Sequence, residues 1–178
     1  MELDLQNEYM PEILDALARS YFTTLVVDVQ NDRYQVVHLT PSRGECGHDG
    51  GTAQWETGEY SGSMHKQLMA FVKEEDRQRV GDALSLPNLC AMLRRDGTGK
   101  ERNESYYVDY QVAYGTDIHW YRAITMALHF GPDGSPEKLL LMFKDITAQK
   151  AEEEKKQREL QKAYELAELA ERANQAKT

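Results

Sequence analysis

Two patterns of apolar and polar residues divide the chain. Residues 105–114 and 118–130 alternate apolar and polar side chains with a period of two, and residues 138–144 form a continuous apolar run. Residues 115–117 and 131–134, which separate these segments, contain the turn formers Gly, Asp and Pro. A period of two is typical of a half-buried strand, and an unbroken apolar run is typical of a strand buried on both faces. We predict three consecutive antiparallel strands joined by hairpins.

Two further strands are predicted nearer the start of the chain. Residues 21–29 and 33–39 are rich in β-branched and aromatic side chains, and Gln30-Asn31-Asp32 between them is typical of a turn. Residues 40–63, rich in Gly, Ser and Thr, predict an irregular loop. Residues 64–94 predict a helical region interrupted at a proline.

Residues 1–20 show a helical period instead. Apolar side chains recur at every fourth position from Leu5 to Leu17, as they do along one stripe of a helix. Pro11 lies inside this stretch, and an interior proline removes a backbone hydrogen bond, so we expect the helix either to kink or to begin there. The apolar stripe is broad for so short a helix, and we expect it to contact a second copy of the chain.

The last segment, residues 148–178, contains neither Gly nor Pro and consists mainly of strong helix formers. Its apolar residues step by three and four, as the seam of a coiled coil does. The seam comprises Leu160, Ala163 or Tyr164, Ala167, Ala170 and Asn174. We predict one long helix that pairs with a second copy. Its first half is polar, so pairing is weak there, which suits a helix pair with two states of similar free energy.

Composition and charge limit the class of protein. A chain of 178 residues has room for one globular domain and an appendage, with boundaries predicted at 1–20, 21–147 and 148–178. The net charge of −9 belongs to residues 1–147, because the acidic and basic residues of 148–178 balance. An acidic domain repels phosphate backbones, so no nucleic acid partner is expected. The sequence has neither a signal peptide nor an apolar run that could span a membrane, so we expect a cytoplasmic location. A membrane anchor elsewhere in a longer parent protein remains an open alternative.

No set of residues predicts catalysis or a bound metal. The nucleotide-binding, zinc-protease and serine-hydrolase motifs are missing. Cys46 and His48 lie close together in a glycine-rich stretch, but no second cluster completes a zinc site, and a plain loop is the better interpretation. His65 could be an axial haem ligand, although a lone helical histidine usually has no such role. Cys90 lies in an apolar run that is typical of a buried, inert thiol. We therefore predict no cofactor, neither haem nor flavin, and no enzymatic activity for these residues.

Arg122 interrupts the apolar stripe that Trp120 and Ile124 form in its strand. A charged group on an apolar face needs a partner or a route to solvent. Asp145, at the end of the last strand, could be that partner through a charge-assisted hydrogen bond. Alternatively, the side chain reaches solvent at the edge of the sheet. The residues alone do not separate these two readings.

The order of helix, two strands, helices, three strands and long helix resembles a PAS domain over residues of about 15–150. Residues 71–77 (FVKEEDR) resemble the family's "hPEDR" phrase without its proline, and Trp120-Tyr121-Arg122 resembles its W-x-R. Asp145-Ile146-Thr147 matches the motif with which such domains pass into an output helix. The resemblance implies an α+β fold with a five-stranded antiparallel sheet, flanking helices and a pocket between them. It also implies that the Asp-Ile-Thr junction transmits the signal, with Arg122 and Trp120 as further transmission residues.

The end of the chain extends the resemblance. Residues 170–178 (AERANQAKT) resemble the segment that leads into the phosphoacceptor helix of sensor histidine kinases. The expected function is therefore a regulatory sensor and homodimerisation domain, with a small molecule as candidate ligand. Phosphotransfer to a response regulator is expected only in the parent protein. Two alternatives stay open: control of a diguanylate cyclase, and a dimerisation module without a ligand.

At the junction itself, Thr147 or Asp145 is expected to cap the start of the helix by accepting backbone N–H bonds. If Asp145 also pairs with Arg122, the last strands and the helix are clamped together. A ligand that shifts the sheet would then rotate the helix or change its register.

Overall fold

The structure is a computed structural model that describes residues 20–39, 57–95 and 103–176. The chain divides into two compact units, Met1–Asp145 and Ile146–Thr178. The first unit combines a sheet with helices, and the second is one long helix. The predicted α+β class with a long C-terminal helix is confirmed.

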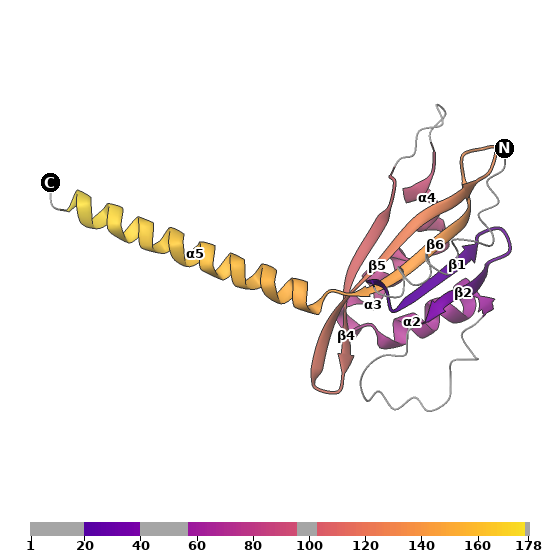
Figure 1. The fold of residues 1–178 in the computed structure, drawn as a ribbon, viewed down its shortest axis with the longest axis horizontal. Helices are drawn as coiled ribbons and strands as arrows, with labels where there is room; N and C mark the ends of the chain where they lie inside the picture. Colours follow the sequence, from indigo (N-terminus) through magenta and orange to yellow (C-terminus); the bar gives the residue numbers. More distant parts are fainter. Residues whose placement is uncertain (1–19, 40–56, 96–102, 177–178) are drawn as a thin grey trace. The chain divides into compact units, whose positions relative to one another are not determined.

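The sheet of the first unit is antiparallel and has six strands in the order β3-β2-β1-β6-β5-β4. Figure 1 shows these strands side by side. The last strand of the chain, β6, therefore lies in the middle of the sheet between β1 and β5. The strands are β1 (Thr23–Asp28), β2 (Arg33–Leu39), β3 (Thr57–Glu59), β4 (Tyr106–Tyr114), β5 (Asp117–Phe130) and β6 (Pro136–Asp145).

The helical region lies between β3 and β4. It consists of a π-helical turn (Tyr60–Met64), α2 (His65–Phe71), a 3-10 turn (Glu74–Asp76), α3 (Arg77–Ala83) and α4 (Leu86–Leu93). The helical region is interrupted between α3 and α4, next to the predicted Leu86-Pro87, and Pro87 itself lies in the first turn of α4, where its missing N–H costs nothing. Helix α5 (Thr147–Gln175) makes up the second unit.

The sheet has one strand more than the predicted five. Strand β3 lies in the stretch that was expected to be an irregular loop, and it pairs with the start of β2. Its three residues, Thr-Gly-Glu, carry no alternation of apolar and polar side chains, so the sequence pattern contains no sign of it. Gly58 of β3 lies close to the ring of Tyr34 on β2. A Cβ at this position would lie 2.9 Å from that ring, so a residue with a side chain would force the two apart.

The hydrophobic core lies on one face of the sheet, against the helices. Val80, Leu84, Leu89 and Leu93 of the helical region belong to one buried cluster with strand residues. The residues of β6 that belong to this cluster are the odd-numbered 139, 141 and 143. Figure 1 shows α2, α3 and α4 gathered beside the sheet.

The apolar stripe of β5 lies on the other, open face. On the side of β5 that faces the core lie the small residue Ala123 and Thr125, and both are fully buried. The larger Ile118, Met126 and Leu128 expose 48%, 39% and 53% of their surface. The sequence pattern therefore identified the strand correctly, although its more apolar side is not the side that faces the core.

Several sequence predictions fall outside the described residues. They are the N-terminal helix of residues 1–20, apart from its last residue, and the Cys46–His48 stretch. None of the described helices combines the length and the apolar character needed to cross a bilayer. Within the described ranges, no three His, Cys, Asp or Glu side chains are grouped so that they could hold a metal ion.

Candidate signal-transmission site

The junction predicted to carry the signal consists of the end of β6 and the start of α5. Strand β6 ends at Asp145, helix α5 begins at Thr147, and only Ile146 lies between them. Ile146 is the N-cap residue, and its carbonyl accepts a 2.9 Å hydrogen bond from the N–H of Lys150. The expectation that Thr147 or Asp145 would hold the cap position is wrong, because the cap residue is Ile146, which lies between them. An isoleucine side chain cannot accept a hydrogen bond, so the cap is made by the backbone alone.

Arg122 pairs with Asp109 on the neighbouring strand β4. Its Nε and Nη2 atoms donate to the two carboxylate oxygens of Asp109 at 2.6 and 2.9 Å. The two side chains expose only 23% and 18% of their surface, and the guanidinium also lies 4.5 Å from the ring centre of Tyr107. A fork-to-fork geometry of this kind gives both strength and direction to an ion pair.

The register of the sheet explains why Asp145 is not the partner of Arg122. Arg122 lies opposite Asp109 on one side and Lys144 on the other, whereas Asp145 lies opposite Tyr121. Side chains of successive residues point to opposite faces of a sheet, so Arg122 is on the open face and Asp145 is not. The proposed clamp between them is corrected to the pair of Arg122 with Asp109.

Asp145 has a histidine beside it instead. One of its carboxylate oxygens lies 3.7 Å from Nδ1 of His119, and the two side chains are 49% and 37% exposed. The contact is an ion pair only when His119 is protonated, and exposure to solvent keeps it weak. Trp120, the remaining predicted residue, lies opposite Gln111 on the open face, two positions from Arg122. The structure thus places Trp120 and Arg122 together and Asp145 on the other face.

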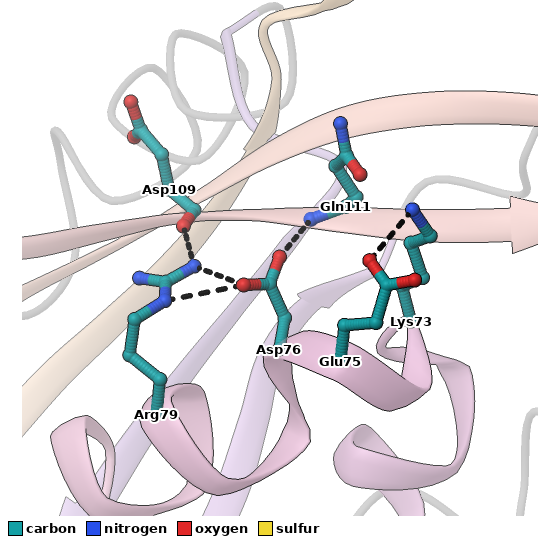
Figure 2. Close-up of polar contacts among 6 residues, drawn as sticks. All are labelled: Lys73, Glu75, Asp76, Arg79, Asp109 and Gln111. Carbon is teal, nitrogen blue, oxygen red and sulfur yellow. Dashed lines mark hydrogen bonds and ion pairs between the residues drawn. The ribbon is translucent and has the colours of Figure 1, made fainter.

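Sequence reasoning missed the residues that join β4 to the helices. Figure 2 shows the carboxylate of Asp76 between the guanidinium of Arg79 and the main chain of Gln111. Asp76 accepts from Arg79 at 2.9 and 3.2 Å and from the N–H of Gln111 at 3.5 Å. Arg79 also donates to the carbonyl of Asp109 at 2.9 Å. Asp109 therefore holds Arg122 with its side chain and Arg79 with its backbone.

The same segment gives a physical reason for the phrase at residues 71–77. The N–H of Lys73 donates to the carbonyl of Gln111 at 2.8 Å, and Val72 forms an isolated bridge with Val112. Nε of Arg77 closes the turn by donating to the carbonyl of Val72 at 3.0 Å. The turn between α2 and α3 thus pairs with the outer edge of β4 like a short extra strand.

The environments of the two candidate residues of the helical region, His65 and Cys90, and of the nearby Tyr60 favour structural roles. Nε2 of His65 lies 2.8 Å from the carbonyl of Gly81, which can only accept, so this nitrogen carries the proton. The hydroxyl of Tyr60 donates to the carbonyl of Leu84 at 2.8 Å, and burial raises the pKa of this phenol far above its usual range. Burial also raises the pKa of the half-buried Cys90 thiol, which favours its unreactive form.

Three large side chains on the strands, Met126, Met142 and Phe143, could line a ligand site, but they do not share one face of the sheet. Phe143 belongs to the core cluster, whereas Met126 and Met142 lie on the opposite face, where Met126 is 39% exposed and Met142 only 5%. Thr125 is fully buried on the core face between Leu141 and Tyr106, and its hydroxyl has no hydrogen-bond partner among the described residues. A buried hydroxyl without a partner costs free energy, so this position is a candidate contact for a bound molecule.

Comparison with known proteins identifies the fold. The chain matches no family model and no curated protein sequence. It resembles the crystal structure of a sensory box histidine kinase/response regulator from Burkholderia thailandensis E264, with a TM-score of 0.50 and 17% identity over 88% of this chain and 98% of that one. The N-terminal domain of a diguanylate cyclase with PAS/PAC sensor from Marinobacter aquaeolei is also similar, with a TM-score of 0.42 and 11% identity over 71% of this chain and 96% of that one. The chain has a PAS-like fold, as its sequence motifs predicted.

Proposed function

We propose that this chain is a regulatory sensor and dimerisation domain whose output is the geometry of helix α5. The observation that carries the proposal is covalent continuity: the central strand β6 passes through one residue into a helix of 29 residues. At about 1.5 Å per residue such a helix is roughly 43 Å long. A PAS-like fold is a common host for sensing, although the fold alone does not define a function.

The surface of α5 supports pairing with a second copy. The large apolar side chains of its second half all expose more than half of their surface; they are Leu160 (57%), Tyr164 (64%), Leu166 (67%) and Leu169 (61%). Exposed apolar side chains in water favour association. Leu166 does not belong to the predicted seam, which comprises Leu160, Ala163 or Tyr164, Ala167, Ala170 and Asn174. The N-terminal helix of residues 1–20 remains a proposed second contact between the two copies.

The dimer is tested with two leucines that differ in position but little in exposure. Replacing Leu160 by Asn removes the leucine side chain of the seam, and we expect the dimer dissociation constant to rise at least tenfold in sedimentation equilibrium. Leu166→Asn is the matched control, and it should leave the dissociation constant within about threefold. A chain that is monomeric at high concentration without substitution would contradict the dimer. A larger effect of Leu166→Asn would contradict the seam.

The ligand half of the proposal rests on Thr125 and its unpartnered hydroxyl. A small molecule with a hydrogen-bonding group that reaches the core face would satisfy it. Cofactor-free purified protein should then bind at least one member of a small-molecule collection in thermal-shift screening, and Thr125→Val should abolish the shift. If no compound shifts the unfolding temperature of the native chain, a dimerisation module without a ligand is the better description.

For the parent protein we propose a histidine kinase output, with catalysis and phosphotransfer outside these residues. The proposal is supported by the resemblance of residues 170–178 to the segment that precedes a phosphoacceptor helix. The fold neighbour from Burkholderia thailandensis, described as a sensory box histidine kinase/response regulator, points the same way.

The role of the junction is tested in the full-length parent. Asp145→Ala should change the autophosphorylation rate at least threefold while the unfolding midpoint moves little, because Asp145 is half exposed. Asp117→Ala is the control, since Asp117 is an exposed carboxylate at the turn of the β4–β5 hairpin, four residues before Tyr121, which lies opposite Asp145. Equal rates for native protein and Asp145→Ala would remove Asp145 from the transmission path. Cyclic dinucleotide synthesis by the parent would identify a diguanylate cyclase instead.

A further inference from the structure

Strand β4 forms one edge of the sheet. An edge strand directs alternate backbone N–H and C=O groups outward, where another strand can pair with them. On β4 the outward groups include the carbonyl of Asp109 and both backbone groups of Gln111, because these are the groups that the helical region reaches. The turn between α2 and α3 occupies the Gln111 carbonyl, so the groups that a second strand could recognise through its main chain here are the carbonyl of Asp109 and the N–H of Gln111.

The helical region covers this part of the edge with two side chains and one turn. Arg79 donates to the carbonyl of Asp109, and Asp76 accepts from the N–H of Gln111 (Figure 2). The N–H of Lys73 donates to the Gln111 carbonyl. Asp76 also holds the guanidinium of Arg79 in place by two hydrogen bonds. Arg79 is 54% exposed, so its side chain contributes little to the core.

We propose that Asp76 and Arg79 form a latch that closes the edge of β4 against strand addition by a second copy of this chain. Two antiparallel edges of the same sequence are self-complementary about a two-fold axis, so a second copy is the partner that fits without any further recognition element. The need for closure is greatest when another contact already holds two copies together, because the effective concentration of the second edge is then high.

The test opens the latch in the full 178-residue chain and measures association. The variant Asp76→Ala/Arg79→Ala is compared with the chain that lacks these two substitutions, and both carry Leu160→Asn, so pairing through α5 is weakened equally in the two chains. We expect a concentration-dependent doubling of mass in sedimentation velocity for the open variant only. In dilute solution the Gln111 amide should exchange with deuterium at least tenfold faster, because its acceptor is gone.

Lys73→Ala is the matched control. It removes the 3.0 Å ion pair of Lys73 with Glu75, which lies beside the latch in Figure 2, but keeps the Lys73 backbone N–H bonded to Gln111. We expect no added association and no faster Gln111 exchange. Equal association of Lys73→Ala and the open variant would overturn the proposal, because a general loss of surface charge would then explain both.

A third variant shows whether the new contact uses the edge itself. Adding Gln111→Pro to the open variant removes an outward N–H, and proline is tolerated at a sheet edge but cannot donate. The mass should return to that of the unopened chain, and persistent association would overturn the proposal. If the double variant does not fold, Arg79→Ala alone is the decisive chain. Unchanged mass for a folded variant at high concentration would show that the latch does not control association.

Discussion

At the scale of single residues, Asp109 joins two parts of the first unit that the sequence did not connect. Its carboxylate holds Arg122 on the open face of the sheet, and its backbone carbonyl receives Arg79 from α3. Both side chains of the Asp109–Arg122 pair are largely shielded from solvent. Removing one partner of such a pair leaves the other charge poorly solvated, which is the main cost of breaking it.

We therefore expect Asp109→Ala to lower the free energy of unfolding by about 1.5–3 kcal/mol, the range for hydrogen bonds to charged groups. Asp145→Ala should lower it by less than about 0.5 kcal/mol, because its contact with His119 is longer and exposed. Urea unfolding monitored by circular dichroism measures both variants. Equal losses for the two would contradict the assignment of Asp109 as the partner of Arg122.

Substitution of Thr125 is expected to change the free energy of unfolding in the opposite direction. A buried hydroxyl without a partner opposes folding, and Thr125→Val replaces it by a methyl group of similar size. The free energy of unfolding should rise by about 1 kcal/mol, with an unchanged dependence on denaturant. A loss of 1 kcal/mol or more would instead mean that the hydroxyl is hydrogen-bonded in solution.

At the scale of elements, the two tight turns of the last hairpins differ in what surrounds them. Gly115 and Gly134 both adopt positive φ, at 60° and 75°, where a residue with a Cβ is strained. A Cβ on Gly134 would also lie 2.9 Å from the carbonyl oxygen of Arg95, whereas a Cβ on Gly115 would meet nothing within 4 Å. The main chain of Gly134 is tied to the same residue, because its carbonyl accepts from the N–H of Arg95 at 2.9 Å.

Gly115→Ala should cost about 1 kcal/mol, which is the conformational term alone. Gly134→Ala should cost at least twice as much, because the loop must also move away from Arg95. Thermal unfolding of the two variants against native protein tests the difference. Similar midpoints for both would contradict the close packing of Gly134 against Arg95.

The helices and strands also show which features of the fold a local sequence pattern can predict. The period of two located β4 and β5, and the continuous apolar run located β6, all close to their observed bounds, since these signals depend only on the strand itself. The face of β5 that enters the core depends on its neighbours: Ala123 lies between Phe143 and Val108, which are already large. Strand β3 depends on pairing alone and has no pattern to detect.

The candidate site was predictable in part for the same reason. The Asp-Ile-Thr junction follows from local sequence and lies where the strand ends. The partner of Arg122 follows from the register of the β4–β5 hairpin, in which Tyr114 lies opposite Asp117. Counting back from that short turn places Asp109 opposite Arg122, so this signal was present in the sequence. The latch residues Asp76 and Arg79 required the packing of α3 against β4, which no local pattern encodes.

At the scale of the whole molecule, the chain combines a sheet of paired strands with a helix whose side chains are exposed over residues 151–175. Ion pairs within α5 are spaced three or four residues apart and are largely exposed, as for Lys156 with Glu152 and Arg172 with Glu168. Pairs of this kind support a helix by only a few tenths of a kcal/mol each. The helix should therefore be less stable than the sheet unit unless a second copy covers it.

The place of β6 in the sheet restricts the kinds of motion that it can pass on. Because the strand is bonded on both sides, to β1 and to β5, a shift along its own axis would break two ladders at once. A change in sheet twist breaks neither, since neighbouring strands already differ in direction by roughly 20–25° and tolerate a wide range. A signal that leaves through β6 is thus expected to be a torque, not a push. If β6 twists, a helix attached to it would turn with it, and a different side of the helix would then face a given direction.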